Sequence, residues 1–224
     1  MTDGQGAGDN RLNIAVLDYG IGNLRSAQKA MERVGAQATL TDDPETIEQA
    51  DGVILPGVGN FGACMNALVA TGLADQARKV AERGQPFLGI CVGMQMLFEG
   101  SDESPDIPGL GILPGRIEWL PDTVKRPQMQ WNQLQTVSVD GRSHPLLDGL
   151  SGGWVYFVHS LAPVTDRNVI ATTDYGGPVV AAVARDNVYA TQFHPEKSAA
   201  GGLRLLGNFL ACCRAASPTN GESA

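Results

Sequence analysis

Apolar runs alternate with amphipathic stretches along the first hundred residues of the chain. Continuous apolar segments too short for typical helices predict buried strands at 12–17, 38–40, 51–56 and 85–90. Apolar residues recur with helical spacing at 24–34 and 47–50, and a further segment of helical character follows at 92–98. Fully apolar strands separated by helices are typical of a parallel sheet that is covered on both faces.

The second half of the chain has a different pattern, because residues 107–150 are richer in proline and contain only short β segments. These segments predict antiparallel additions to the sheet. Further strands are expected at 154–158, 171–173, 179–183 and 188–193, and a closing helix at 203–214. We predict one α/β domain over residues 11–214, a mostly parallel, doubly wound sheet flanked by helices. The polar, glycine-rich ends, 1–10 and 215–224, are predicted to be disordered tails.

The composition limits the partners and the cellular setting. The 224 residues, 43% of them hydrophobic, can bury one substantial core. A net charge of −8, with no run of more than two adjacent Lys or Arg, predicts no nucleic-acid or anionic-membrane partner. Four cysteines without framework spacing, and no signal peptide or long apolar span, predict a cytoplasmic protein. No histidine pair has metal-ligand spacing and Cys212-Cys213 forms no CxxC clip, so we expect neither metal nor cofactor.

One cysteine stands where a buried strand is expected to turn into a helix. Cys91 lies between Gly89 and Gly93, at the junction of the apolar run 85–90 and the helical segment 92–98. A strand-to-helix turn of this kind presents a nucleophile on a sharp elbow, and the glycines allow the backbone to pass closely beneath it. The start of a helix also favours a thiolate over a thiol. The alternative is a packed, chemically inert cysteine.

A candidate base follows the last predicted strand. His194 and Glu196 are two residues apart, so on an extended backbone their side chains project to the same side, and Glu196 can orient the His194 ring toward a thiol. Of the two other histidines, His144 lies in a polar turn and is expected at the surface. His159 lies in an apolar strand, as a hydrogen-bonded core residue or a pocket wall. The sequence therefore favours a Cys91, His194, Glu196 triad.

A glycine loop after the strand at 51–56 is the candidate source of oxyanion donors. Residues 57–62 read GVGNFG, and such loops leave backbone N–H groups free to meet developing negative charge. The same letters match the dinucleotide fingerprint G-x-G-x-x-G. That interpretation is disfavoured, because the loop does not open a first βαβ unit and no acidic residue ends a strand about twenty residues further on.

With these pieces in place, the chain resembles the class I (triad) glutamine amidotransferases over nearly its whole length. Within that family it is most similar to the glutaminase subunits of imidazole glycerol phosphate synthase. Five segments in the same order carry the resemblance: DYGIGNLRS at 18–26, PGVG at 56–59, GICVGMQ at 89–95, YFVHS at 156–160 and QFHPEKS at 192–198.

The resemblance implies roles for individual residues. Cys91 would be the nucleophile, His194 the proton carrier and Glu196 its orienter. The backbone N–H groups of Val58 and Val92 would hold the oxyanion. Gln95 and Gly59, with the backbone around Ser160, would hold L-glutamine.

The resemblance also implies a partner. Ammonia would pass through a channel into a (β/α)₈ barrel cyclase subunit in a heterodimer, which makes imidazole glycerol phosphate and an aminoimidazole carboxamide ribotide in histidine biosynthesis. Asn23 and Lys197 would face that cyclase. The alternatives without a partner are that Asn23 is a turn or cap residue and that Lys197 is a solvated surface charge.

The chain departs from the family pattern at three positions, where Gln128 and Gln130 replace a histidine and a glycine, and Leu161 stands where an aromatic residue is common. These changes put the coupling to the partner and the pocket wall in question, but not the triad. Two other functions remain open at this stage. One is a glutaminase that serves a different synthase, against which the loop at 18–20 and the Lys-Ser pair at 197–198 argue. The other is a non-enzymatic α/β partner protein with a packed Cys91.

Overall fold

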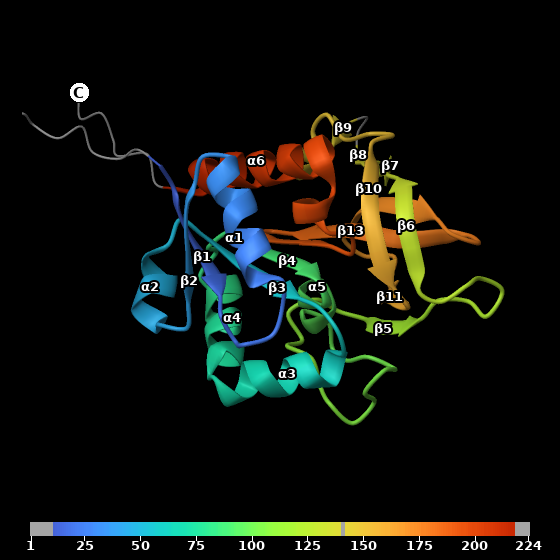
Figure 1. Ribbon diagram of the computed structural model, residues 1–224, viewed down its shortest axis with the longest axis horizontal. Helices are drawn as coiled ribbons and strands as arrows, with labels where there is room; N and C mark the ends of the chain where they lie inside the picture. Colours follow the sequence, from blue (N-terminus) through green and yellow to red (C-terminus); the bar gives the residue numbers. More distant parts are fainter. Residues whose placement is uncertain (1–10, 140–141, 218–224) are drawn as a thin grey trace, which may run out of the picture.

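The computed structural model describes residues 11–139 and 142–217, in which a central mixed sheet is covered by helices on both faces (Figure 1). The predicted tail at 1–10 lies outside the described residues. The main sheet is ordered β2 (Gln37–Thr41), β1 (Asn13–Leu17), β3 (Gly52–Gly57), β4 (Phe87–Cys91), β14 (Val188–Thr191), β13 (Pro178–Arg185), β12 (Val169–Asp174) and β7 (Gln135–Thr136). Strands β2 to β14 in this order are parallel, and the remaining pairings are antiparallel.

Helices α1 (Leu24–Arg33) and α6 (Ala199–Ala216) pack together on one face of the sheet, above it in Figure 1. The opposite face carries α3 (Phe61–Ala70), α4 (Leu73–Glu82) and α5 (Val92–Met96), and α2 (Pro44–Gln49) contacts α4. Two short 3₁₀ helices, η1 (Pro145–Leu147) and η2 (Pro195–Lys197), complete the set. The expected single α/β domain with a doubly wound sheet is thus confirmed.

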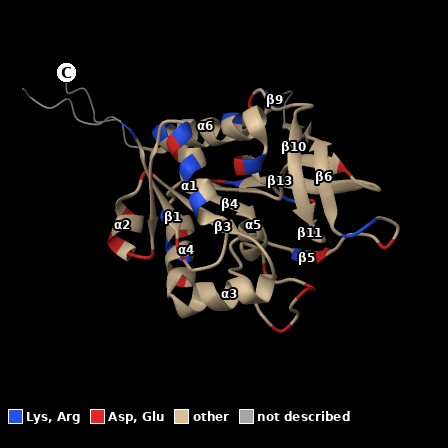
Figure 2. Cartoon of the chain, viewed as in Figure 1, with Lys and Arg blue, Asp and Glu red and all other residues tan. Residues whose placement is uncertain are grey.

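Three antiparallel ribbons account for the antiparallel additions predicted from the middle of the chain. They pair β6 (Gln128–Gln133) with β10 (Trp154–His159), β5 (Arg116–Trp119) with β11 (Leu161–Val164), and β8 (Ser138–Val139) with β9 (Arg142–Ser143). Neither β6 nor β10 contains a charged residue, and both strands are free of red and blue in Figure 2.

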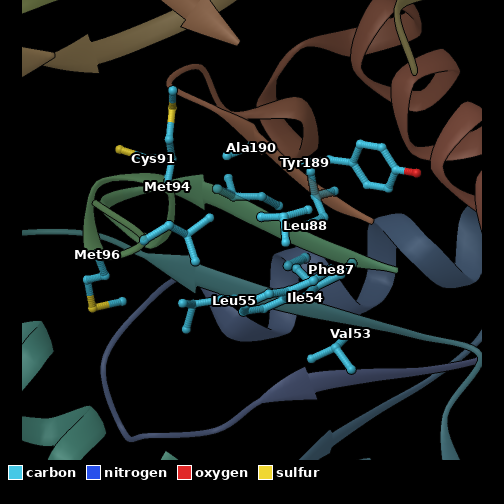
Figure 3. Close-up of a cluster of buried hydrophobic side chains, with 14 of the residues drawn as sticks. Val53, Ile54, Leu55, Phe87, Leu88, Cys91, Met94, Met96, Tyr189 and Ala190 are labelled. Atoms are coloured by element: carbon cyan, nitrogen blue, oxygen red, sulfur yellow. The ribbon is translucent and has the colours of Figure 1, made fainter. Parts of the chain in front are cut away.

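The core lies at the centre of the sheet, where every residue of β3, β4 and β14 is buried. Figure 3 shows Val53, Leu55, Leu88 and Ala190 gathered around these strands, with Cys91 at the end of β4. Burial on both faces explains why these strands are continuous apolar runs instead of alternating ones. The nucleophile candidate is therefore attached to the buried centre of the sheet.

The closing helix is longer than predicted at both ends. It begins at Ala199 instead of 203. Gly202 is a weak helix former and argued against an earlier start, but this glycine is there for packing, because a Cβ would lie 1.8 Å from the Pro195 carbonyl oxygen. It ends at Ala216, so the prediction of a tail from 215 is wrong by two residues, since Ala215 and Ala216 are good helix formers that extend the last turn. The predicted tail beyond this helix, 218–224, lies outside the described residues.

Within the described ranges, none of the helices is long and apolar enough to cross a membrane.

Candidate active site

Cys91 ends β4 in a backbone conformation that residues with a side chain rarely adopt, with φ 55° and ψ −113°. The chain turns directly into α5, as predicted for a nucleophile elbow. A Cβ on Gly93 would lie 1.8 Å from the Leu55 carbonyl oxygen, so the elbow passes against β3 with no room for a side chain. The flanking glycine therefore serves the close approach that the sequence indicated.

The last strand brings the candidate base to the candidate nucleophile. Strand β14 pairs in parallel with β4, so both strands end at the same edge of the sheet. The backbone N–H of His194 donates to the Tyr156 carbonyl at 3.0 Å, which fixes the start of η2. The His194 side chain then lines the same cavity as Cys91. Two segments about a hundred residues apart in sequence thus form one site.

The predicted base and carboxylate pair is formed. His194 Nδ1 lies 2.8 Å from Glu196 Oε1, and the two side chains are only 2% and 3% exposed. Burial alone would lower the pKa of His194, but hydrogen bonds and charge from Cys91 and Glu196 outweigh it and raise the pKa to about 9. Because Nδ1 is directed at the carboxylate, the other ring nitrogen is left for proton transfer at the thiol.

Asn23, expected at a partner surface, also contacts the triad. Its side-chain Nδ2 donates to Glu196 Oε1 at 3.4 Å across 173 positions of sequence, and the residue is half-buried. It sits at the start of α1 without a side-chain capping bond. The other carboxylate oxygen of Glu196 is buried and has no hydrogen-bond partner among residues 11–139 and 142–217. Lys197, the second residue expected at the partner surface, is exposed at the rim of the cavity.

A cavity of about 330 Å³ opens above Cys91. Its wall contains every residue to which the family resemblance gave a role in oxyanion or glutamine binding, namely Val58, Gly59, Val92, Gln95 and Ser160. The candidate nucleophile Cys91 and the candidate base His194 lie in the same wall. A volume of this size suits a small-molecule ligand. The structure thus brings the predicted site residues together in one place.

The glycine loop after β3 forms one side of this cavity. Gly59 has φ +89°, a value that favours glycine, and the carbonyl of Val58 accepts a hydrogen bond from the Cys64 thiol at 3.3 Å. The next residue, Asn60, caps α3 by accepting from the Ala63 N–H at 3.0 Å. The loop is therefore held at both ends while its middle borders the cavity.

The histidines outside the triad occupy different environments. His159 is 6% exposed and is both a core residue and a cavity wall, with Nδ1 2.8 Å from the Leu161 carbonyl. His144 was expected at the surface but is half-buried, because its ring packs against Tyr189 at 5.7 Å. Across the described residues, no group of three or more His, Cys, Asp or Glu side chains has the arrangement of a metal site.

A comparison with known protein families decides the assignment. The model of the family described as "Glutamine amidotransferase class-I" matches residues 15–212. This chain belongs to the class-I glutamine amidotransferases. It is accordingly a glutamine-hydrolysing enzyme subunit, and the alternative of a non-enzymatic partner protein is set aside.

Relatives of this amidotransferase share one name. The chain is 49% identical over 206 residues to "Imidazole glycerol phosphate synthase subunit HisH" of Syntrophotalea carbinolica, covering 88% of this chain and 98% of the relative. It is 45% identical over 220 residues to the protein of that name from Halobacterium salinarum, covering 94% and 98%. The sequence likeness therefore extends over nearly the full length of both relatives.

Solved structures share the fold of this amidotransferase. The structure described as "Crystal structure of glutamine amidotransferase" is 25% identical and superposes with a TM-score of 0.69 over 90% of this chain and 98% of that one. The "Structure of PurLQS from Thermotoga maritima" gives a TM-score of 0.70 at 22% identity, over 90% and 99%. The second likeness is one of fold alone.

Sequence analysis did not identify one charged residue in the wall of the amidotransferase cavity. Glu103 lines the cavity, and its Oε2 accepts from the Phe61 N–H at 2.6 Å. It lies in an irregular loop among other acidic residues, at Asp102 and Asp106, and no periodicity or spacing distinguishes it from them. Only the fold, which places this loop beside the start of α3, identifies it.

Proposed function

We propose that this protein is the glutaminase subunit of an imidazole glycerol phosphate synthase. It hydrolyses glutamine to glutamate and ammonia, and a cyclase subunit uses the ammonia to make imidazole glycerol phosphate in histidine biosynthesis. The observation that most supports glutamine hydrolysis is the buried His194–Glu196 pair, whose histidine lines the same cavity as Cys91. The relatives at 45% to 49% identity support the choice of synthase over another amidotransferase.

The reaction begins with attack by the Cys91 sulfur on the side-chain carbonyl carbon of glutamine. The carbonyl oxygen becomes an oxyanion, which the backbone N–H groups of Val58 and Val92 stabilise by hydrogen bonds. Both residues line the cavity together with Cys91. Stabilising charge that develops only in the transition state accelerates the chemical step.

His194 then supplies a proton to the departing nitrogen, so that ammonia leaves instead of an amide anion. A pKa raised to about 9 keeps this imidazole protonated at neutral pH, and Glu196 holds its ring in one orientation. Water, deprotonated by the now neutral His194, attacks the thioester. Glutamate leaves, and the Cys91 thiolate and the protonated His194 are restored.

The remaining wall residues hold the substrate. Gln95, Gly59 and the backbone at Ser160 provide hydrogen-bonding groups around the cavity. The Glu103 carboxylate complements a positively charged α-ammonium group, which every free amino acid carries at neutral pH. A negative charge in the wall therefore favours free glutamine over an uncharged amide.

The partner surface lies on the β6–β10 ribbon. Met129, Trp131 and Trp154 on its outer face are 62%, 44% and 55% exposed, and neither strand carries a charge. Aromatic residues and methionine without charge are typical of the centre of a protein interface. The ribbon borders the cavity through Val158 and His159, so a cyclase bound there would meet the ammonia source. Asn23 and Lys197 extend this surface toward the cyclase. The complex functions in the cytoplasm.

The test uses glutamate release and product formation with the purified chain and a cyclase subunit. We expect glutamine hydrolysis to rise strongly when the cyclase and its ribotide ligand are both present. Cys91→Ala should abolish glutamine-dependent synthesis but leave ammonia-dependent synthesis by the cyclase unchanged. Full glutaminase activity without any cyclase would indicate an amidotransferase that serves another synthase. Loss of both activities in a folded Cys91→Ala complex would contradict the division of labour between the subunits.

A further inference from the structure

A buried glutamine behind the cavity contacts the nucleophile. Gln192 is 0% exposed and does not line the cavity, yet its side-chain Nε2 donates to the Cys91 sulfur at 3.8 Å. Its backbone N–H donates to the Ala181 carbonyl of β13 at 2.9 Å, so the residue is fixed to the sheet just after β14. Gln192 is therefore placed to influence the thiol without touching a ligand in the cavity.

The hydrogen bonds around Gln192 can run in only one direction. Gln95 Nε2 lies 3.1 Å from the Leu161 carbonyl, which can only accept, so this end of the Gln95 amide is the nitrogen. The same nitrogen lies 3.1 Å from Gln192 Oε1, which must then be the acceptor. Consequently the nitrogen of Gln192 is the atom that faces Cys91. Chemistry alone fixes the orientation of both amides.

We infer that Gln192 is a positioning residue that donates a hydrogen bond to the Cys91 thiolate and holds the Gln95 amide in its binding orientation. A donor to sulfur stabilises the charged thiolate more than the neutral thiol. At a buried position that effect is larger than in water. Gln192 thus adds to the activation of Cys91 by His194, and this role rests on the proposed function of Cys91 as nucleophile.

The other titratable groups close to Cys91 come from three separate segments. Those that interact directly with Cys91 are His194 after β14, Tyr19 after β1 and Cys64 on α3, and the wall of the same cavity also holds Glu103, His159 and Lys197. Burial raises the pKa of both Tyr19 and Cys64, so these two are neutral around pH 7 and His194 is the charged neighbour. The pH dependence of Cys91 alkylation therefore reports on His194 and Gln192 together. Substitution of Gln192 separates its effect on the Cys91 sulfur from that of His194.

The test measures the rate of alkylation of Cys91 by iodoacetamide in the full-length chain between pH 5 and 10, followed by mass analysis of the Cys91 peptide. Gln192→Met keeps the length and burial but removes the donor. We expect it to raise the pH midpoint of alkylation by about one unit and to slow the reaction about tenfold below that midpoint. Gln192→Glu, which places a carboxylate at the sulfur, should raise the midpoint further.

Thr191→Val is the matched control. Thr191 is the neighbouring residue, is 0% exposed, and its Oγ1 donates at 3.0 Å to the Phe193 carbonyl, not to Cys91 or Gln95. This variant loosens the same segment and should leave the pH midpoint where it is. A shift as large as that of Gln192→Met would mean that general loosening is the cause, and would overturn the inference.

The remaining outcomes separate this inference from the proposed function. A reactive wild-type Cys91 with the same pH profile in both Gln192 variants contradicts the role of Gln192 alone. If Gln192→Met does not fold, the comparison of Gln192→Glu with wild type decides in the same way. A wild-type Cys91 that is unreactive at every pH contradicts both the nucleophile and its positioning residue.

Discussion

Cys91 occupies a backbone conformation that costs stability. At φ 55° and ψ −113° the Cβ crowds its own backbone, and a non-glycine residue held in such a region costs about 1–3 kcal/mol. The packed sheet on one side and α5 on the other maintain it. Strain of this kind collects at functional residues, because the turn that exposes the side chain is the turn that a side chain disfavours.

This strain predicts an unusual order of stability among inactive variants. Cys91→Gly should be more stable than Cys91→Ala by about 1 kcal/mol, since relief of the strain exceeds the extra chain entropy that glycine loses on folding. Both variants lack the sulfur, so their difference isolates the backbone. Urea denaturation measures it, and a Cys91→Ala protein that is equal or superior in stability would contradict the strain.

His159 predicts a dependence of stability on acid. Burial lowers its pKa to about 4, against a smaller opposing effect of its hydrogen bond to the Leu161 carbonyl. As the pH falls, His159 therefore becomes protonated at about pH 6.5 in the unfolded chain but only at about pH 4 in the folded protein. The stability that neutral His159 contributes is present above pH 6.5 and is lost as the pH falls to 4, up to about 3 kcal/mol.

The measurement compares free energies of unfolding of wild type and His159→Gln at pH 7, 5.5 and 4. As the pH falls, the free energy of unfolding of wild type should decrease more than that of His159→Gln. Carboxylates and His194 titrate in both proteins, so their contribution cancels in the comparison. Parallel curves would show that His159 is not buried in its neutral form.

At the scale of elements, the turn at Cys91 depends on the close contact between α5, which contains Gly93, and β3. Gly93→Ala would place a Cβ 1.8 Å from the Leu55 carbonyl, so α5 must move away from β3. We expect a loss of about 1–3 kcal/mol of stability from overpacking and a loss of glutamine hydrolysis, because Val92 and Cys91 move with the turn. Activity assays and urea denaturation together test this.

A second glycine provides the control for that substitution. Gly207 lies inside α6, and a Cβ there would meet nothing within 4 Å. Gly207→Ala should therefore raise the stability by up to about 1 kcal/mol through helix propensity, with unchanged activity. If Gly93→Ala behaved like Gly207→Ala, the close approach of the elbow to β3 would have no structural importance.

The parallel half of the fold and the pairing of His194 with Glu196 were predictable from sequence because their signals are local. Continuous apolar runs mark strands that are buried on both faces, and His194 and Glu196 are two residues apart. Gln192 and Glu103 were not predictable, since their partners lie far away in sequence. The pairing of Gln128 with His159, whose side chains are in contact at 3.0 Å, depends on the register of β6 against β10. Register between distant strands leaves no trace in a single sequence.

For the molecule as a whole, the uncharged β6–β10 ribbon predicts where the partner binds. Trp131→Ala should weaken the affinity for the cyclase about tenfold or more, since exposed aromatic residues at interface centres carry much of the binding energy. The loss of stability should be small, because Trp131 is 44% exposed. Calorimetric titration with the cyclase measures the affinity.

Val69→Ala on α3 is a matched control, because Val69 is 59% exposed and lies away from the ribbon. Its affinity for the cyclase should equal that of the wild type. Equal affinities for all three proteins would place the partner on a different face. A weakened glutaminase response with unchanged affinity would instead assign Trp131 to the coupling between the subunits.

The order of strands has a consequence for how the protein is made. Of the strands that the structure describes, β14 at the centre of the sheet is the last in chain order, and it joins β4 to β13. Until it arrives, the sheet exists as two pieces with bare apolar edges, and Cys91 has neither His194 nor Gln192 beside it. Long-range pairings of this kind form slowly. The nascent chain therefore carries an unactivated thiol until β14 and the segment that follows it are in place.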